Sequence, residues 1–427
     1  METISDTVFL MLIYAATVLY LLLRKKRAVV YLLDFTCYRA SDSHRLPTSM
    51  FCEYVHLDDR MDEEAKALQV KILERSGYSE ETHVPPSLKE LPVMCRYSSA
   101  REEASMVIFS AVEDLLKRAS TSPRAIDILI INNSLFTPVP SLTAMVINRF
   151  NMRSNVMSFN LSGMGCSAGI VSVSLASDLL KVHRNSLALV VSTEVLTGNW
   201  YTGKNKSMLI SNCLFRMGCA AVLMSSQDQD KRKAKYELKH LVRTNRSGNN
   251  QSYTCVYQDE DSENKMGILL SKTLVTVAGD ALKTNMASLG RQALPLSEQI
   301  RYIWSLVMQR IKVGRTRGIY VPDFRRAFEH FCIHAGGKAV IEAIEKSLKL
   351  SHQDVEASKM TLSKFGNTSS SSIWYELAYI EARRRMKVGD TVWQIALGSG
   401  FKCNSAVWKC INISTGSEMQ KVWEGKL

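Results

Sequence analysis

The sequence predicts an α/β fold built around a mostly parallel sheet. Short, continuous apolar runs alternate with segments of helical periodicity along most of the chain, the pattern typical of strands joined by crossover helices. Of the 427 residues, 46 % are hydrophobic and 22 % are charged, which is close to ordinary globular usage. This composition excludes a wholly disordered chain, a collagen-like fibre and a polytopic membrane protein.

The net charge and the cysteine content indicate what kind of partner and which redox compartment suit this protein. The 54 Lys and Arg residues exceed the 41 Asp and Glu residues, which gives a formal net charge of +13. This excess suits an anionic partner, such as nucleic acid, a membrane surface or a phosphorylated cofactor. Ten cysteines without a CxxC pair indicate neither a disulfide scaffold nor structural zinc, so a reducing compartment is the simpler interpretation.

The N-terminus predicts a single membrane anchor. Residues 8–23 read VFLMLIYAATVLYLLL without a charge, and the four cations of residues 24–27 follow directly. A cleaved signal peptide carries its cations before the apolar run, so that alternative is weaker, as is a helix lying in the interface. The positive-inside rule then places everything after residue 23 in the cytosol. Glycosylation sequons such as those at Asn160 and Asn205 are expected to remain unmodified there.

The elements of the first half follow in order along the chain. Strands are expected at residues 28–35, 125–133, 157–163, 187–193 and 219–225. Helices are expected at residues 62–75, 100–119, 142–150 and 166–183, where apolar side chains recur at helical spacing. The charged stretch 228–235 is predicted to be an exposed connector.

The second half repeats this alternation. Helices are expected at residues 272–289, 338–350 and 369–386, a strand at 328–334, and two strands around a glycine turn at 391–413. The pattern therefore predicts two similar α/β halves, although no sequence identity between them is visible.

Cys166 is the candidate nucleophile. It opens a predicted helix after a strand and a glycine turn, within NLSGMGCSAG at residues 160–169. The glycines permit a tight turn and close approach of a substrate. A helix N-terminus favours the thiolate and offers backbone N–H groups to an oxyanion. The alternative is a buried structural cysteine that follows a tight turn.

Two downstream segments supply candidate partners for the cysteine. His334 ends the strand-like HFCIH of residues 330–334 before a double glycine, and it is the better placed catalytic residue. His330 either supports it or lies in the core, and on a strand the two histidines are about 13 Å apart, too far to share a metal ion. Asn367, in the polar turn FGNTSSSS, either offers a fixed amide donor or only precedes the next helix.

A thiolate with two N–H donors fits two chemistries. In a cysteine hydrolase, the histidine acts as the base and the asparagine orients it. In a condensing enzyme, the cysteine carries an acyl group while the two donors stabilise the enolate left when a malonyl group loses carbon dioxide. Residue spacing alone does not choose between them.

Seven segments resemble plant 3-ketoacyl-CoA synthases, the condensing enzymes of very-long-chain fatty acid elongation. They are YLLDFTCY (31–38), NNSLFTPVPSL (132–142), NLSGMGCSAG (160–169), NCLFRMG (212–218), FEHFCIHAGGKAV (328–340), FGNTSSSSIWYEL (365–377) and GSGFKCNSAVWKC (398–410). The resemblance implies a thiolase-like, five-layered αβαβα fold of two related halves, with the N-terminal hydrophobic membrane anchor in front. It implies that Cys166 accepts the acyl group, that His334 and Asn367 complete a triad, and that His330 belongs to the same motif.

This resemblance also implies a division of the chain and a reaction. Residues 1–27 form the anchor and its basic flank, 28–95 a connecting region, 96–230 the half with the cysteine, and 231–427 the half with the histidine and asparagine. The expected reaction is a decarboxylative Claisen condensation of malonyl-CoA with a long-chain or very-long-chain acyl-CoA, without a metal or redox cofactor. The product is a 3-oxoacyl-CoA two carbons longer, and the glycine turn at 398–400 is expected near the acyl thioester.

Location and partners follow from the same resemblance. It implies a single-pass protein of the endoplasmic-reticulum membrane that faces the cytosol, and a homodimer in a complex with a ketoacyl-CoA reductase and a dehydratase, without nucleic acid. Asn245 and Ser363 stand where the family usually has histidine. These departures motivate an alternative, a catalytically impaired homologue that modulates an elongase complex, and a soluble polyketide-type synthase is another.

Overall fold

The computed structural model describes residues 29–93, 95–310, 320–413 and 421–425. Within them, one nine-stranded sheet has the order β3-β2-β4-β5-β1-β6-β11-β10-β9, and β7 and β8 form a separate hairpin. The strands are β1 (Tyr31–Cys37), β2 (Ile128–Asn132), β3 (Met157–Leu161), β4 (Leu187–Glu194), β5 (Gly218–Ser225), β6 (Tyr236–Asn245), β7 (Val256–Glu260), β8 (Met266–Leu270), β9 (His330–Ile333), β10 (Thr391–Gly398) and β11 (Lys402–Cys410).

Helices cover both faces of the sheet. They are α2 (Thr48–Leu57), α3 (Glu63–Glu74), α4 (Tyr97–Arg118), α5 (Leu142–Phe150), α6 (Ala168–Val182), α7 (Lys206–Leu214), α8 (Asn250–Tyr253), α9 (Leu274–Ala293), α10 (Leu296–Arg310), α11 (Lys338–Leu348), α12 (His352–Phe365) and α13 (Ser372–Ala382). The predicted α/β fold is therefore confirmed.

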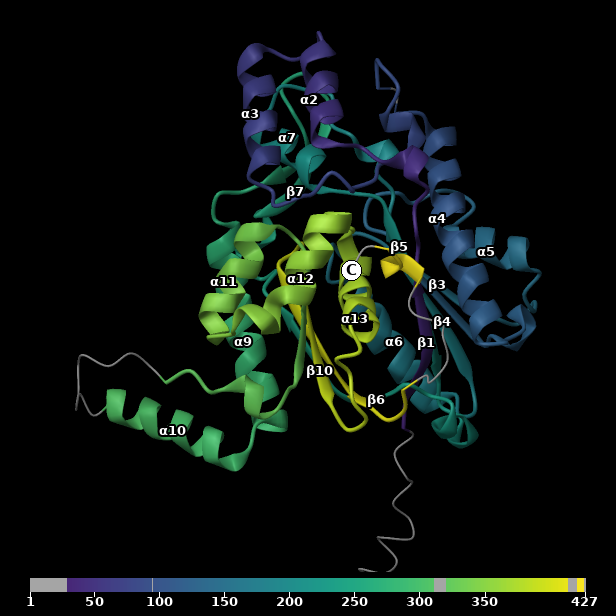
Figure 1. Cartoon of the computed structure of the whole chain (residues 1–427), viewed down its shortest axis with the longest axis vertical. Coiled ribbons are helices and arrows are strands. Elements are labelled where there is room, and N and C mark those ends of the chain that lie inside the picture. Colours follow the sequence, from purple (N-terminus) through teal and green to yellow (C-terminus); the bar gives the residue numbers. More distant parts are fainter. Residues whose placement is uncertain (1–28, 94, 311–319, 414–420, 426–427) are drawn as a thin grey trace, which may run out of the picture.

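The elements stack in five layers (Figure 1). Helices α4 and α5 cover the outer face of the first half of the sheet, and α9 covers the outer face of the second half. Between the halves lie α6, which touches β2 and β4 on one side and β10 and β11 on the other, and α13, which touches β1, β5, β9 and β10. Within the sheet, the strands of the two halves meet where Tyr31 and Leu32 of β1 pair with Glu237 and Tyr236 of β6. The two central helices add contacts with strands of both halves.

The expectation of a mostly parallel sheet is wrong. In the described nine-stranded sheet, β2 runs parallel to β3 and β4, and β9 runs parallel to β10, whereas the other five pairings are antiparallel. Strands β4 and β5 form one of these antiparallel pairs, yet nearly all their side chains are buried. Because helices cover both faces, antiparallel strands here have the continuous apolar sequence that usually marks parallel ones.

Strand β1 lies within residues 28–95, which were expected to form a connecting region, yet it is a central strand of the sheet. It pairs with β5 along its length and places residues 31–37 in the middle of the sheet. Its Asp34 forms a buried ion pair with Lys235 at 2.8 Å, and Lys235 also contacts Glu381 at 3.2 Å. The stretch 228–235 was predicted to be an exposed connector; that prediction holds for residues 228, 229 and 231–233 and fails at the buried Asp230, Ala234 and Lys235.

The predicted membrane anchor at residues 8–23 lies outside the described residues. In the part of the chain that the structure describes, none of the helices combines the length and the apolar character needed to cross a bilayer.

Trp374 offers a test of the connection between the halves. Its fully buried ring lies 5.6 Å from the ring of Phe35 on β1 and 6.3 Å from the ring of Trp408 on β11. Trp374→Ala should therefore lower the free energy of unfolding by about 3–5 kcal/mol in a single transition, measured by denaturant titration. The exposed Trp304→Ala is the control and should change it by no more than about 0.5 kcal/mol. Two separated transitions in the wild type would contradict the coupling.

Candidate active site

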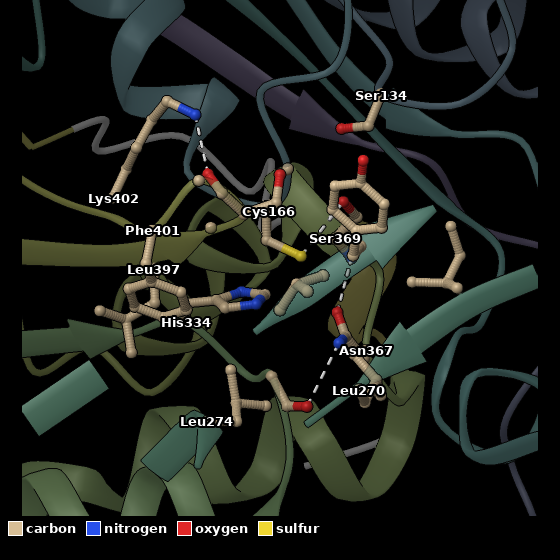
Figure 2. Close-up of a pocket in the computed structure, with 18 of the residues that line it drawn as sticks. Ser134, Cys166, Leu270, Leu274, His334, Asn367, Ser369, Leu397, Phe401 and Lys402 are labelled. Atoms are coloured by element: carbon tan, nitrogen blue, oxygen red, sulfur yellow. Dashed lines mark hydrogen bonds between the residues drawn. The ribbon is translucent and has the colours of Figure 1, made fainter. Parts of the chain in front are cut away.

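One cavity of about 500 Å³ lies between the two halves, and Cys166, His334 and Asn367 all line it. Cys166 comes from the first half, at the turn between β3 and α6, whereas His334 and Asn367 come from the second half, after β9 and α12. Figure 2 shows the sulfur and the imidazole turned toward the same part of the cavity, with the amide beside them. The three residues singled out in the sequence therefore meet in one place.

Glycines position the cysteine. Gly163 and Gly165 have φ angles of +67° and +66°, values that residues with a Cβ rarely adopt. A Cβ on Gly165 would also overlap the backbone nitrogen of Ser399, and one on Gly398 would lie 2.6 Å from the backbone nitrogen of Ser167. The turn that carries Cys166 therefore packs directly against the glycine turn of the other half.

The resting cysteine is a thiol. The pKa of the Cys166 thiol is raised to about 12, mainly by burial; a hydrogen bond from Ser369 acts against the rise, and the nearby Glu194 adds to it. The expectation that the helix N-terminus would favour the thiolate is therefore reversed, because loss of hydration inside the cavity outweighs the helix dipole. Deprotonation has to be coupled to substrate binding or to proton transfer.

His334 is neutral and held by a serine. The side chain is 3 % exposed, and burial lowers the pKa of the imidazole to about 4. Its Nδ1 lies 2.7 Å from Oγ of Ser372, which also accepts a hydrogen bond from the backbone N–H of Ala335. Because a hydroxyl can donate to Nδ1 or accept from it, His334 can present either a lone pair or an N–H at Nε2.

Asn367 has a defined orientation. Its Oδ1 accepts from the backbone N–H of Ser369 at 2.8 Å, and its Nδ2 donates to the carbonyl of Gly336 at 3.2 Å. Since one partner can only donate and the other can only accept, the amide cannot be flipped. The backbone of Asn367 is fixed in turn by Arg216, whose N–H donates to its carbonyl.

Glu194 is a buried carboxyl group beside the cysteine. It accepts hydrogen bonds from the backbone N–H groups of Ser134 and Leu135 at 3.1 Å, and Ser369 Oγ lies 3.1 Å from its Oε2. The same Ser369 hydroxyl lies 3.5 Å from the Cys166 sulfur. Burial raises the pKa of Glu194 to about 7. A single hydroxyl proton can serve the carboxylate or the sulfur but not both, so protonating Glu194 frees Ser369 to stabilise the thiolate.

His330 lies apart from this group. It begins β9, its Nε2 lies 2.9 Å from a carboxylate oxygen of Asp390, and it is not among the residues that line the cavity. The structure therefore brings together three of the four candidate residues. Among the described residues, no group of three or more His, Cys, Asp or Glu side chains is arranged to hold a metal ion.

The rest of the cavity has one polar end and a long apolar wall. The turn at residues 398–401 borders the polar end near Cys166. The β7–β8 hairpin, α9 and α11 supply the apolar wall, through Val256, Ile268, Leu270, Leu274, Ala278 and Val340. Such a cavity suits a ligand with a reactive polar group at one end of a hydrocarbon chain.

Comparisons with known proteins agree with this arrangement. Residues 21–311 match the family model described as FAE1/type III polyketide synthase-like protein, and residues 326–410 match the C-terminal model of 3-oxoacyl-[acyl-carrier-protein] synthase III. The probable 3-ketoacyl-CoA synthase 21 of Arabidopsis thaliana is 58 % identical over 91 % of this chain and 84 % of its own. The 3-ketoacyl-CoA synthase 7 of the same plant is 53 % identical over 94 % of this chain and 87 % of its own.

The chain belongs to the 3-ketoacyl-CoA synthase family. The resemblance found in the sequence is thereby confirmed. Its fold also matches the solved structure of 1,3,6,8-tetrahydroxynaphthalene synthase from Streptomyces coelicolor, a bacterial type III polyketide synthase, with a TM-score of 0.70 at 17 % identity over 90 % of this chain and 99 % of that one.

Asn245 and Ser363, the two positions where the resemblance led us to expect histidine, lie outside the cavity wall. Asn245 ends β6, and its Oδ1 accepts from the backbone N–H and the hydroxyl of Ser247, which itself lines the cavity. Ser363 lies on α12, where its carbonyl accepts from the backbone N–H and the hydroxyl of Ser79. In this synthase, neither substitution removes a residue from the group around Cys166.

Sequence reasoning missed Glu194, Ser369 and Ser372. Ser369 and Ser372 stand inside the motif that contains Asn367, but the run of four serines does not show which hydroxyl faces which partner. Glu194 is the last residue of the buried strand β4, which runs from Leu187 to Glu194. A carboxylate at the end of a buried strand was the signal that could have found it.

Glu194→Gln tests how Glu194 and Ser369 influence the thiol. The donors on Oε1 keep the amide oxygen of the glutamine in place, so its NH₂ faces Ser369 and leaves that hydroxyl directed at Cys166. As pH rises through about 7 the wild-type carboxyl ionises, and its charge opposes the thiolate. Alkylation of Cys166 by iodoacetamide should then become faster in the variant than in the wild type, by about tenfold at alkaline pH.

Peptide mass spectrometry assigns the alkylation to Cys166, and Glu103→Gln is the matched control. Glu103 is also buried with a pKa raised to about 7. Its carboxylate accepts hydrogen bonds from the backbone N–H groups of Leu196 and Thr197, and it does not line the cavity. Equal alkylation profiles for wild type and Glu194→Gln would show that Glu194 does not influence the sulfur.

Proposed function

We propose that this chain condenses a long-chain or very-long-chain acyl-CoA with malonyl-CoA to give a 3-oxoacyl-CoA two carbons longer. The observation that carries the proposal is the convergence of Cys166, His334 and Asn367 on one cavity with an apolar wall. Membership in the 3-ketoacyl-CoA synthase family supports it, because relatives 48–58 % identical bear that name. Both donors, His334 and Asn367, belong to the same half and line the cavity together with the sulfur.

Acyl loading is the first step. The Cys166 thiol gives its proton to Nε2 of His334 while the sulfur attacks the thioester carbonyl of the acyl-CoA. The tetrahedral intermediate collapses, the carbon–sulfur bond to CoA breaks, and the leaving CoA thiolate takes the proton back from His334. The products are the Cys166 thioester and free CoA. A neutral imidazole is needed here, and the lowered pKa of His334 keeps it neutral.

Decarboxylation and condensation form the second stage. The bond between the malonyl methylene and its carboxylate breaks, carbon dioxide leaves, and the electron pair enters the thioester as an enolate. Nε2–H of His334 and Nδ2–H of Asn367 donate to the enolate oxygen. The enolate carbon attacks the Cys166 thioester, the new carbon–carbon bond forms, and Cys166 leaves as a thiolate that regains a proton from solvent. No metal or redox cofactor takes part.

Ser372 supports both stages as a positioning residue. Loading requires a lone pair at Nε2, whereas decarboxylation requires an N–H there. Between the stages the imidazole loses its Nδ1 proton to solvent and gains one from solvent at Nε2. The Ser372 hydroxyl accepts from Nδ1–H before this exchange and donates to Nδ1 after it. His334 can therefore change its role without turning its ring.

We further propose that the chain works as a homodimer at the endoplasmic-reticulum membrane, with its catalytic part in the cytosol and with a ketoacyl-CoA reductase and a dehydratase as partners. Support for the location comes from the apolar run at residues 8–23 and the cations of residues 24–27. A reductase and a dehydratase are the enzyme classes whose chemistry consumes a 3-oxoacyl-CoA.

Product analysis tests the function. The full chain, purified in detergent, is incubated with labelled acyl-CoA and malonyl-CoA, and the products are identified by mass spectrometry. The proposal expects label bound to the wild type but not to Cys166→Ala, and a 3-oxoacyl-CoA extended once. Repeated extension of one starter would indicate a polyketide-type synthase. Turnover that malonyl-CoA does not change would indicate a hydrolase, and an unlabelled wild type would indicate an impaired homologue. Each of these three outcomes overturns the proposal.

Asn367→Ala should separate the two stages. The variant lacks the amide donor for the enolate but keeps the sulfur and the imidazole, so acyl loading on Cys166 should continue. Condensation should fall by about 10²–10³-fold, the usual effect of removing one oxyanion donor. Intact-protein mass spectrometry measures the loading and release of labelled carbon dioxide measures the second stage. Equal loss of both stages would contradict a specific role in decarboxylation.

A further inference from the structure

Helix α10 presents an exposed apolar stripe. Leu296, Ile300, Ile303, Trp304 and Val307 recur at helical spacing along one face, and their exposed fractions run from 41 % at Val307 to 74 % at Leu296. In Figure 1 the helix extends sideways from the lower part of the body rather than packing against it. An exposed apolar stripe of this size marks a site of interaction with a partner or a membrane.

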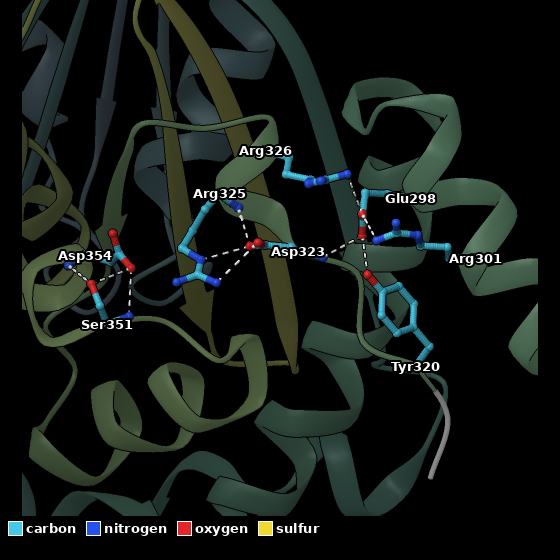
Figure 3. Close-up of polar contacts among 8 residues, drawn as sticks. All are labelled: Glu298, Arg301, Tyr320, Asp323, Arg325, Arg326, Ser351 and Asp354. Atoms are coloured by element: carbon cyan, nitrogen blue, oxygen red, sulfur yellow. Dashed lines mark hydrogen bonds and ion pairs between the residues drawn. The ribbon is translucent and has the colours of Figure 1, made fainter. Parts of the chain in front are cut away.

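The opposite face of α10 is fixed to the body by polar contacts (Figure 3). Glu298 has a fully buried side chain that accepts from the Tyr320 hydroxyl at 2.6 Å and the Asp323 N–H at 3.0 Å, and pairs with Arg326 at 3.1 Å. Glu298 is two residues from Ile300, which places it about 200° around the helix. These contacts therefore fix the helix with its apolar stripe turned outward.

The base of α10 lies at the edge of the sheet where the described chain begins. Glu298 contacts Arg326 shortly before β9 starts, and β10 starts beside it, at Thr391. Thr391 pairs with Lys409 on β11, the next residue on β11 pairs with Tyr236, and Tyr236 pairs with Leu32 at the start of β1. The predicted anchor at residues 8–23 ends only a few residues before β1.

Exposed cations gather at this edge. They are Lys231, Arg232 and Lys233 before β6, Arg384 and Lys387 before β10, and Lys409 on β11. The exposed carboxylates near them are Asp228 and Glu329, and Glu329 accepts hydrogen bonds from Thr391. The excess of positive charge suits an anionic surface. The active-site cavity lies at the other end of these strands, where Gly398 and His334 line it.

We propose that α10 lies in the headgroup region of an anionic bilayer, with Leu296, Ile300, Ile303, Trp304 and Val307 inserted into it. The inference rests on the proposed membrane location and adds a second contact, which orients the catalytic body. A helix with an apolar stripe and a tryptophan inserts its apolar face about 5–10 Å into the acyl boundary. The base of α10 lies at the same edge of the sheet as the start of β1, which follows the predicted anchor, and exposed cations surround that edge. Both features favour a lipid surface over a second copy of the chain.

Trp304 allows a direct measurement on the full chain. Of the six tryptophans, Trp374, Trp393, Trp408 and Trp423 are fully buried and Trp200 is partly buried, so Trp304 is the exposed one. The protein is reconstituted into vesicles whose phosphatidylcholine carries brominated acyl chains, with or without phosphatidylserine. The Trp304 emission is the wild-type emission minus that of Trp304→Phe. The proposal expects the brominated chains to quench this emission. Quenching should be stronger with bromines near the glycerol end than near the chain end, and stronger with phosphatidylserine.

A double variant and a matched control complete the test. Ile300→Glu with Ile303→Glu should abolish the quenching, whereas Leu57→Glu, an exposed apolar residue at the end of α2, should leave it unchanged. Flotation of the vesicles reports the anchor separately. Protein that floats with unquenched Trp304 overturns this inference while the membrane location stands, and protein that does not float overturns both. A double variant that turns a dimer into a monomer in detergent, with the wild type unquenched, would assign the stripe to a second copy.

Discussion

Close backbone contact between the two halves is the constraint on which the site depends. Gly165 packs against the backbone of Ser399, and Gly398 packs against Ser167, so neither glycine has room for a Cβ. This contact brings the cysteine of one half within reach of the histidine and asparagine of the other. The central helices α6 and α13 maintain it by touching strands of both halves. Catalytic geometry in this chain is therefore a consequence of how the halves stack.

Much of the fold could be predicted because apolar periodicity survives in a single sequence. The strands at residues 125–133 and 187–193 and the helix at 100–119 lie where the pattern placed them. Strand direction could not be predicted, since helices bury both faces of parallel and antiparallel strands alike. Strand β6 was missed because polar residues interrupt YELKHLVRTN, so it lacks the continuous apolar run that marked the other strands. The central place of β1 depends on pairing with strands nearly two hundred residues away, which no local pattern encodes.

For the site, too, the local sequence identified the residues, whereas their protonation states depend on packing. Cys166, His334 and Asn367 were visible because each stands beside glycine or in a distinctive turn. Their protonation states were not, because the neutral thiol and the neutral imidazole result from burial by elements distant in sequence. Glu194 acts on the sulfur through its charge and through Ser369, a hydrogen-bond partner 175 residues away in the sequence. These pKa shifts therefore result from the packing of the two halves and could not be predicted from any single segment of the sequence.

The central claim is that two side chains of one half donate to an enolate that forms beside the cysteine of the other half. A structure of the full chain with a non-decarboxylating malonyl-CoA analogue tests it most directly. The account predicts that the thioester oxygen of the analogue lies within about 2.6–3.2 Å of both Nε2 of His334 and Nδ2 of Asn367. A bound analogue whose thioester oxygen lies beyond that reach of both atoms, or points to the backbone N–H of Cys166 instead, would contradict the account.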